Sequence, residues 1–367
     1  MLKNYFKIAF RNLSRNKLFT FINIFGLALS MSVCLLVLMR IKEQLSYDKF
    51  HPDPSSIYRI ITEVTNRQGA EHRLATTPLL LAPALVNEYN LVDKYVRFYP
   101  VAVQRASTQG KQLIIDGCFT DSHFIDVFGF RLKAGNTATA LTAPNTIVIS
   151  SETATKFFGN QNPVGQVISF DDLGSFTVTG VLEKPAGKSH LEFNAYLSMS
   201  SVSALERAGK LNPISEQWNN GTSAYTYAVL KKGAGQKQLE KAVGQISSTL
   251  MKDTKVEGKE RVSFEVQPFN DIILGEELAY NLGNTGSLGK VMAEIAISFI
   301  ILLSACFNYT NLSLARSLKR GKEVGIRKVA GAFRFQIFFQ FVVESLFITF
   351  LSLALACLFL QLMMDYA

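Results

Sequence analysis

The sequence predicts a membrane protein that combines α-helical transmembrane segments with a mixed α/β (α+β) domain. Three observations support this fold class. Three apolar stretches each reach the length of about 20 residues that a helix needs to cross a bilayer. A long polar block with strand-like and helix-like segments separates the first stretch from the second. The net charge of +9 comes from two short segments beside the apolar stretches.

Residues 1–17 precede the first stretch and contain five cations and no acid. Apolar residues recur at the i, i+3, i+4 spacing of one helix face, while cations recur at every fourth position on another face. We interpret this segment as a cytoplasmic amphipathic helix that lies on anionic membrane lipid. The alternative is a charged leader to a membrane anchor, and both interpretations place the N-terminus inside the cell.

Residues 18–41 form the first predicted span. The run 18–39 contains no charged residue, and it is longer than the roughly 7–15 apolar residues of a cleaved secretory signal. We therefore interpret the segment as an uncleaved anchor that leads out of the cytoplasm.

Residues 42–289 form a predicted periplasmic domain. β-Branched and aromatic residues between turn residues predict strands at 57–65, 146–150, 176–182, 195–199, 223–230 and 262–269. Helices are expected at 78–89, 151–158 and 236–251. A domain of this length has room for an inserted subdomain, which we expect to join near residues 135–144.

No catalytic, metal or cofactor site is expected in this domain. The four histidines have no metal-ligand spacing, and Cys118 is the only cysteine outside the predicted spans. The motifs of metalloproteases and of nucleophile elbows do not occur. The sequence therefore predicts a protein that is not an enzyme.

Residues 290–315 and 335–364 form the second and third predicted spans, the third with an amphipathic lead-in. The loop between them, 316–334, has seven cations and a single acid, Glu323, which places it in the cytoplasm by the positive-inside rule. Outside this loop and residues 1–17, the chain has 26 cations and 28 acids. The large domain is thus not basic, which argues against a nucleic-acid partner.

Glu344 lies at the start of the third predicted span. A carboxylate at the centre of a span costs about 2.5–3.5 kcal/mol, so an edge position is favoured. We expect Glu344 to pair with a loop cation or to lie at the membrane interface, and a role in transport is the alternative.

The loop itself allows two interpretations. Its cations could serve only to fix the topology of the chain. However, apolar residues alternate with these cations, which favours a surface that contacts protein.

Four stretches of the chain have distinctive motifs. They are Lys-Ile-Ala-Phe-Arg-Asn-Leu-Ser-Arg-Asn-Lys at 7–17, Leu-Ser-Tyr-Asp-Lys-Phe-His at 45–51 with Ile-Tyr-Arg at 57–59, Phe-Thr-Val-Thr-Gly-Val-Leu at 176–182, and Gly-Lys-Glu-Val-Gly-Ile-Arg-Lys-Val-Ala-Gly-Ala at 321–332 running to Glu344-Ser345. With these stretches the chain resembles the MacB/FtsX-type permeases of ABC transporters, also called type VII or mechanotransmission systems. The fourth stretch is the most specific, and the resemblance covers the whole chain.

The resemblance implies that the loop is a coupling helix that docks on a separate ABC ATPase subunit. The residues that it assigns to this ATPase coupling are Glu323, Gly325, Ile326, Arg327, Lys328 and Gly331. It further implies a MacB-like periplasmic core domain with an inserted subdomain, followed by an FtsX-like permease domain that starts at about residue 290. The expected location is the bacterial inner membrane, in a dimeric or pseudo-dimeric assembly.

The function implied is that of a permease subunit in an ATP-driven efflux or extraction system, with ATPase motion passed to the periplasmic domain. The alternative is a regulatory or signalling protein of the same fold that controls a periplasmic cell-wall hydrolase as its partner. Similar permeases have four spans per half, and long versions carry two halves. We therefore expect an N-terminal portion of a longer chain. The substrate does not follow from the sequence.

Overall fold

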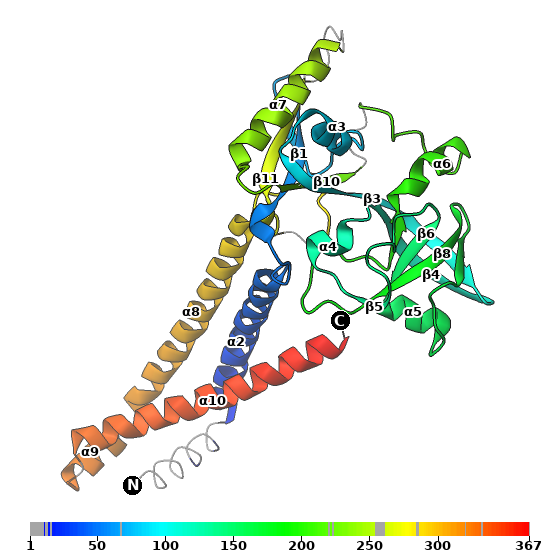
Figure 1. Ribbon diagram of the computed structural model, residues 1–367. Coiled ribbons are helices and arrows are strands. Elements are labelled where there is room, and N and C mark those ends of the chain that lie inside the picture. The colour runs from blue at the N-terminus through cyan, green and yellow to red at the C-terminus, as the bar shows by residue number, and fades with distance from the viewer. Residues whose placement is uncertain are drawn as a thin grey trace. The chain divides into compact units, whose positions relative to one another are not determined.

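The computed structural model describes residues 11, 14, 17–66, 68–218, 221, 224–253, 261–283, 286–319, 321–331 and 333–366. The chain divides into two units (Figure 1). The helical unit comprises Met1–Leu45 and Leu288–Ala367, and the globular unit comprises Ser46–Ser287. The amphipathic helix expected at residues 1–17 lies outside the described residues, apart from Arg11, Ser14 and Lys17.

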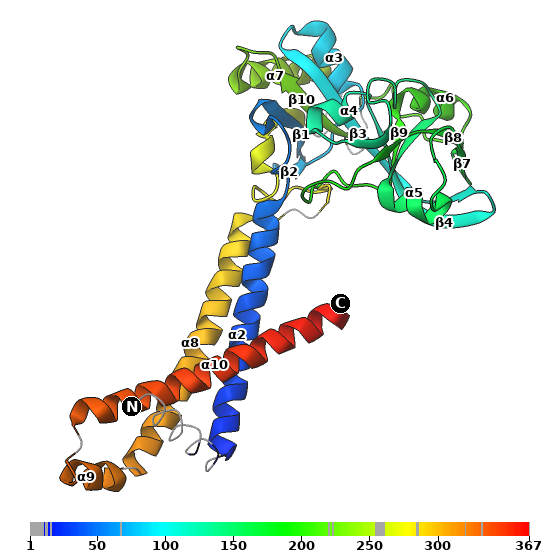
Figure 2. The same cartoon turned by 60° about the horizontal axis from the view of Figure 1, so that its bottom comes forward.

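Long apolar helices make up the helical unit. They are α2 (Lys17–Ser46), α8 (Leu288–Lys319) and α10 (Arg334–Tyr366), and the short helix α9 (Gly321–Val329) lies between the last two. Three stretches, Lys17–Ser46, Leu288–Arg316 and Arg334–Met364, are long and apolar enough to cross a membrane. Within this unit α2 and α8 run alongside each other and α10 crosses them, as Figure 2 shows.

Polar contacts join the three long helices in addition to their apolar surfaces. Arg40 on α2 forms an ion pair with Glu294 on α8, with 3.2 Å between Nη1 and Oε1. The Tyr309 hydroxyl on α8 donates to Ser345 Oγ on α10 at 2.8 Å. Leu27 and Ile348 form a small apolar core between α2 and α10. These contacts fix which faces of the helices meet.

An 11-stranded sheet forms the framework of the globular unit, in the order β11-β1-β10-β3-β4-β9-β6-β8-β5, with β2 paired to β1 and β7 paired to both β3 and β8. The strands are β1 (Ile57–Thr65), β2 (Glu71–Leu74), β3 (Val92–Thr108), β4 (Lys111–Thr120), β5 (Leu132–Gly135), β6 (Thr146–Ser150), β7 (Val167–Phe170), β8 (Gly174–Leu182), β9 (Ala195–Ser198), β10 (Tyr225–Leu230) and β11 (Arg261–Pro268). The helices are α3 (Leu81–Glu88), α4 (Phe124–Phe128), α5 (Ser151–Phe158), α6 (Val202–Arg207) and α7 (Gln236–Asp253), and the 3₁₀ turns are η1 (Pro54–Ser56), η2 (Met199–Ser201) and η3 (Phe269–Asp271).

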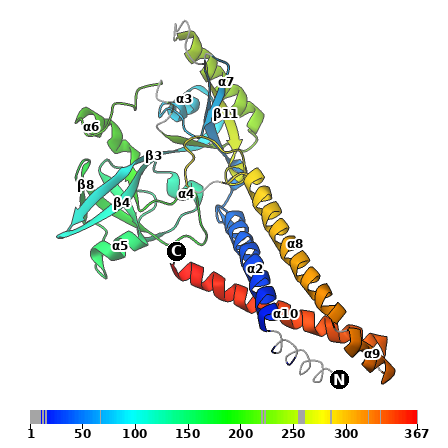
Figure 3. The ribbon, with the colours of Figure 1, turned by 180° about the vertical axis from the view of Figure 1, so that it is seen from behind.

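Part of this sheet closes into a small barrel. The pairings run β3–β4, β4–β9, β9–β6, β6–β8, β8–β7 and back from β7 to β3, so these strands form a ring. A closed ring satisfies the edge strands that an open sheet would expose. Figure 3 shows this part with α5 and α6 beside it. Phe119, Phe157 and Phe176 lie in its buried core.

The other part of the globular unit is an open antiparallel sheet with helices packed on it. Strands β11, β1, β10 and the first half of β3 pair side by side. Leu85 of α3 and Leu239 and Val243 of α7 pack on this sheet in one core. A second core contains Phe98, Phe128 and Tyr227. The predicted combination of long apolar helices with a mixed α/β domain is confirmed.

The place where the two parts join differs from the expectation. Residues 135–144 were the expected junction, but they run from the last residue of β5 towards β6, inside the barrel part. The parts join instead through β3, whose 17 residues pair with β10 in the open sheet and with β4 and β7 in the barrel. One long strand thus serves both parts.

Candidate functional site

The short helix α9 and the turn that follows it contain the residues that the resemblance assigns to ATPase coupling. It spans Gly321–Val329 and ends in a turn at Gly331, whose φ of +91° lies in the left-handed region that favours glycine. Hydrogen bonds from Ala330 N to Ile326 O at 3.0 Å and from Gly331 N to Lys328 O at 3.2 Å close this turn. Gly331 therefore ends the helix and allows the chain to enter α10.

Apolar side chains on and beside α9 are strongly exposed. Ile326 and Val329 are 71% and 91% exposed, and Phe333, just after the turn, is 73% exposed. Ile326 and Val329 lie three residues apart, so they share one face of the helix. Apolar side chains grouped among cations indicate a surface that contacts another molecule.

Gly325 lies inside α9, where glycine costs about 1 kcal/mol relative to alanine. A Cβ built at this position meets no atom within 4 Å. Packing within this chain therefore gives no reason for a glycine there. The open space beside Gly325 leaves its helix backbone accessible on that side, as far as the described residues show.

The structure describes only some of the predicted coupling residues completely. Gly325, Ile326, Lys328 and Gly331 are described, whereas the side chains of Glu323 and Arg327 lie outside the described part. The assignment of these residues to ATPase coupling stays a prediction.

Glu344 is buried on α10, with 7% exposure. It lines a cavity of about 60 Å³ together with Arg316 and Tyr309 of α8. Gln340 Nε2 donates to Glu344 Oε1 at 3.4 Å. The guanidinium of Arg316 also lies over the Phe19 ring of α2, at 4.7 Å from its centroid. The carboxylate therefore lies among polar groups in a cavity lined by α2, α8 and α10, and its expected pairing with a loop cation stays a prediction.

A buried polar cluster in the globular unit was not expected from the sequence. We call it the Asp48 cluster; its members are Asp48, His51, Ser189, His190 and Tyr227, all 8% exposed or less. Asp48 and His51 directly follow α2 in the sequence, Ser189 and His190 lie between β8 and β9, and Tyr227 is on β10. The cluster thus connects three distant segments of the chain.

The Asp48 carboxylate is the centre of this cluster. Its Oδ1 accepts from Ser189 Oγ at 2.6 Å and lies 3.1 Å from His51 Nε2, while its Oδ2 lies 2.6 Å from His190 Nδ1. His190 Nε2 lies 2.8 Å from the Tyr227 hydroxyl. Burial alone would raise the pKa of Asp48, but the hydrogen bonds from His190 and His51 outweigh it and hold that pKa well below its ordinary value.

Burial also shifts the pKa values of the residues that neighbour Asp48. Desolvation lowers the pKa of His190 below its ordinary value, against the opposing effect of the Asp48 carboxylate. Desolvation likewise raises the pKa of Tyr227. Both residues are therefore neutral around pH 7 in the folded protein.

The cluster contains a serine, a histidine and an aspartate, but its geometry is not that of a hydrolase. In a catalytic triad the histidine accepts the serine proton, and the aspartate lies on the other ring nitrogen. Here Ser189 Oγ is closer to Asp48, at 2.6 Å, than to His51 Nε2, at 3.4 Å, and Asp48 faces that same nitrogen. No group of metal-ligating side chains occurs among the described residues.

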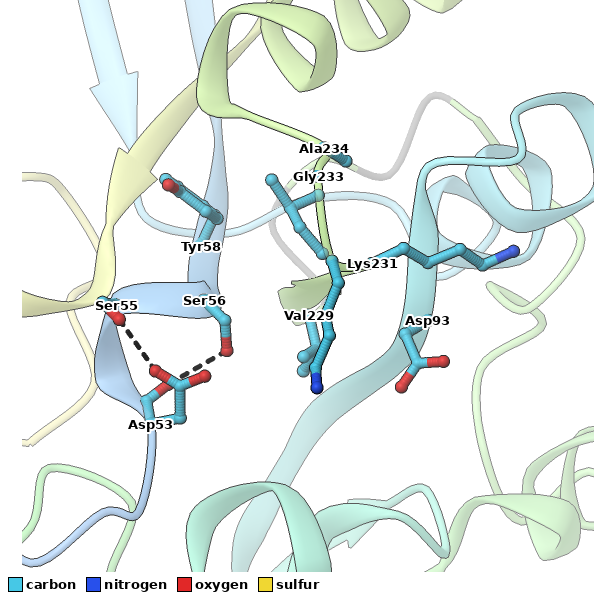
Figure 4. Close-up of a pocket in the computed structure, with 11 residues that line it drawn as sticks. Asp53, Ser55, Ser56, Tyr58, Asp93, Val229, Lys231, Gly233 and Ala234 are labelled. Atoms are coloured by element: carbon cyan, nitrogen blue, oxygen red, sulfur yellow. Dashed lines mark hydrogen bonds between the residues drawn. The ribbon is translucent and has the colours of Figure 1, made fainter.

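A polar groove of about 620 Å³ lies at one end of the open sheet (Figure 4). It is lined by residues of η1, the start of β1 and β3, and the turn between β10 and α7: Asp53, Ser55, Ser56, Tyr58, Asp93, Val229, Leu230, Lys231, Lys232, Gly233 and Ala234. Ser55 Oγ donates to Asp53 Oδ1 at 2.7 Å. Charges of both signs line the groove and all of them are exposed, so it has no built site for one ligand.

Comparison with family models matches two regions of the chain. The MacB-like periplasmic core domain matches residues 20–246, and the FtsX-like permease C-terminal model matches residues 295–367. The second match contains α9 and α10 together with most of α8.

Curated relatives match parts of the chain. The Macrolide export ATP-binding/permease protein MacB of Aggregatibacter actinomycetemcomitans is 26% identical over 230 residues, which cover 61% of this chain and 32% of the relative. The Uncharacterized ABC transporter permease YknZ of Bacillus subtilis is 29% identical over 178 residues, which cover 42% of this chain and 45% of the relative. The chain thus spans less than half the length of either relative.

A solved structure has a similar fold. It is described as a domain of a "putative Permease protein" from Porphyromonas gingivalis and is 18% identical, with a TM-score of 0.51. The match covers 66% of this chain and 98% of that domain. At this identity the likeness concerns the fold alone.

Proposed function

Because the chain belongs to the family of MacB-like periplasmic core domains and continues into an FtsX-like permease segment, we propose that it is the permease subunit of an ATP-driven ABC system. In this proposal the helical unit receives the motion of a separate ATPase subunit and passes it to the globular unit, which acts on a substrate outside the cytoplasm. The chain itself performs no catalysis.

The main support for this proposal comes from the side chains on the surface of α9. Exposed apolar side chains stand among cations on a short helix, and Gly325 lets another backbone approach closely. An acidic patch on a partner would complement the cations and thereby fix its orientation. A nucleotide-binding subunit that docks there would move α9 and, through the continuous chain, α8 and α10.

The charge distribution supports one orientation in the membrane. The segments with excess cations, 1–17 and 316–334, would lie in the cytoplasm by the positive-inside rule. Residues 42–289 would then lie in the periplasm of a bacterial cell, with residues 18–41, 290–315 and 335–364 in the inner membrane. The names of two relatives, a macrolide export ATP-binding/permease protein and an ABC transporter permease, support a location in a membrane.

Lipid would surround the helical unit in this orientation. A groove of about 350 Å³ between α2 and α10 has apolar walls that include Phe21, Phe25 and Leu351, with Lys17 at its polar end. Such a groove suits the acyl chains and phosphate of membrane lipid. A second permease chain or half completes the proposed assembly as a dimer or pseudo-dimer.

Charge reversal on α9 tests the proposal. The double variant Arg327→Glu with Lys328→Glu should insert normally but lose a copurifying ATPase, because two reversed charges repel an acidic docking surface. The measurement is tagged purification of the full-length gene product in mild detergent, followed by assay of bound ATPase. Loss of at least about 90% of the bound ATPase corresponds to about 1.4 kcal/mol of binding free energy.

A matched control reverses two charges elsewhere. Lys237 and Lys241 are exposed on α7, one helical turn apart, and the double variant Lys237→Glu with Lys241→Glu should retain the ATPase. Equal retention by both double variants would refute α9 as the docking surface. Recovery of a cell-wall hydrolase as the main partner would instead favour the regulatory function.

A further inference from the structure

The segment 46–51 begins at the last residue of α2 and makes several contacts within the globular unit. Asp48 N donates to Lys188 O at 2.9 Å. Tyr47 and Phe50 pack against a buried apolar core. The His51 ring lies 5.1 Å from the Phe269 ring and 5.5 Å from the Phe128 ring, measured between centroids. The chain that leaves the first span is therefore anchored within a few residues.

The protonation of His51 follows from its two neighbours. Its Nδ1 lies 2.6 Å from the carbonyl oxygen of Phe128, and its Nε2 lies 3.1 Å from Asp48 Oδ1. Carbonyl and carboxylate oxygens only accept hydrogen bonds, so both contacts are hydrogen bonds when both ring nitrogens carry protons. His51 is then an imidazolium cation paired with the Asp48 carboxylate.

His190 has the complementary arrangement. Its Nδ1 donates to Asp48 Oδ2, and its Nε2 accepts from the Tyr227 hydroxyl. One neutral histidine and one cationic histidine thus face a single carboxylate. The charges of Asp48 and His51 then cancel, which makes their buried ion pair tolerable, and the buried guanidinium of Arg59 lies beside Tyr227.

Contacts of the cluster reach both parts of the globular unit. His190 and Ser189 belong to the connection between the barrel strands β8 and β9, whereas Tyr227 belongs to β10 of the open sheet. A displacement of Asp48 would therefore pull on both parts together. Removing one partner of a buried ion pair is strongly unfavourable. The segment that carries Asp48 is therefore hard to separate from the residues of the globular unit that contact it.

We propose that Asp48, His51 and His190 form a charged clamp that delivers movement of the first span to both parts of the globular unit. This inference rests on the proposed function, because it presumes that ATPase motion reaches α2. The three residues are positioning residues: they act by holding the segment 46–51, and none of them contacts a substrate in this role.

The charge state of the clamp is tested first, without any ATPase. The full chain with ¹⁵N-labelled histidine is reconstituted in lipid, and the ring nitrogens are observed by NMR near pH 7, with the variants His51→Gln and His190→Gln assigning the signals. We expect both nitrogens of His51 to be protonated and only one nitrogen of His190. A neutral His51 would overturn the charged clamp.

The mechanical role is tested with the full chain and its ATPase in lipid. Hydrogen–deuterium exchange is compared between the nucleotide-free and the ATP–vanadate-trapped complex. Wild type should show a nucleotide-dependent change in peptides of α2 and of β10. In Asp48→Ala we expect the change in α2 to persist and the change in β10 to be lost, while the shape-conserving variant Asp48→Asn should be intermediate.

Thr77→Val provides a matched control for general destabilisation. Thr77 is buried in the same unit, where its hydroxyl lies 2.7 Å from Thr226 Oγ1, and it belongs to no segment of the clamp. Thr77→Val should lower the melting temperature and keep the response of β10. Loss of that response in Thr77→Val, or its retention in Asp48→Ala, would overturn the clamp.

A third outcome separates the two proposals. If nucleotide changes exchange in α2 but never in the wild-type globular unit, the mechanotransmission in the proposed function fails. The mechanical role of the clamp then fails with it. The charged state of His51 is decided by the NMR experiment in either case.

Discussion

At the residue scale, Asp48 shows how a buried charge is stabilised by its surroundings. Its φ of 57° lies in the left-handed region, which aspartate tolerates better than most residues. This turn aims the carboxylate into the protein, where the side chains of His51, Ser189 and His190 surround it. The conformational cost of the turn is offset by hydrogen bonds that a carboxylate accepts strongly.

Acid should destabilise the globular unit through His190. The pKa of His190 is lowered in the folded state, mainly by desolvation, so the unfolded chain binds the proton more readily. Stability is then complete above the ordinary value of 6.5 and is lost as the pH falls from there towards the folded pKa. The groups that face this ring are Asp48, Tyr227, His51 and Arg59. The lowered pKa of Asp48 adds a further loss only at more acidic pH.

Thermal unfolding measured between about pH 7.5 and pH 5 would test this expectation. The melting temperature of the globular unit should fall as the pH falls below about 6.5, where the unfolded His190 takes up its proton, and it should fall less steeply in His190→Gln, which cannot take up the proton. A melting temperature that does not depend on pH over this range, or an equal slope in both proteins, would contradict the assignment.

At the element scale, the barrel depends on a tight crossing at the end of β5. Gly135 has a φ of +102°, and a Cβ there would lie 2.3 Å from the carbonyl oxygen of Thr179 on β8. Gly135→Ala should therefore destabilise the globular unit by about 2–4 kcal/mol, from backbone strain and from displacement of β8. Denaturant unfolding of the full chain in detergent measures this change.

Gly110 provides the comparison for Gly135. It lies in the turn between β3 and β4 with a φ of +77°, but a Cβ there meets no atom within 4 Å. Gly110→Ala should cost about 1–2 kcal/mol, which is the strain of a left-handed alanine alone. If the two variants lost equal stability, the close approach of β5 to β8 would make no contribution to the free energy of unfolding.

Predictions of elements from the sequence succeeded where a pattern was local. Strand β6 and helix α5 have the predicted bounds, because β-branched residues at 146–150 precede an N-cap at Ser150. Strands β3 and β4 were missed, although Gln109-Gly110 marks their hairpin turn, with φ values of 49° and 77°. Their exposed and buried residues alternate irregularly because a bulge near Val101 shifts the register of β3.

A site was hard to predict from the sequence when its residues lie far apart along the chain. The predicted coupling residues lie close together in the sequence, between Glu323 and Gly331, so one motif contains them all. The Asp48 cluster joins residues separated by more than 130 positions, and a search for regular histidine spacing cannot find it. The one local signal was Tyr-Asp-Lys-Phe-His at 47–51, in which Asp48 and His51 are buried directly after the first apolar helix.

At the scale of the whole molecule, the chain consists of two units that are suited to different surroundings, lipid and water. The helical unit exposes apolar side chains, such as Phe21, Phe307 and Phe350, over most of its length, as expected of helices that meet lipid. The globular unit has its own cores, each built from residues between Ser46 and Ser287. Water and denaturant therefore act mainly on the globular unit.

The two units should consequently unfold separately, and the single tryptophan of the chain reports on one of them. Trp218 packs against the core that α3 and α7 form with the open sheet. In urea, its fluorescence should change in one cooperative transition while the helical signal of α2, α8 and α10 persists in circular dichroism, because detergent-embedded helices keep their internal hydrogen bonds. The variant Trp218→Phe has no tryptophan, so its fluorescence gives the background signal to subtract. Coincident loss of both signals would mean that the units share one folding transition. The two units would then not be independently stable, and the transmission of movement between two separately folded units would no longer describe this chain.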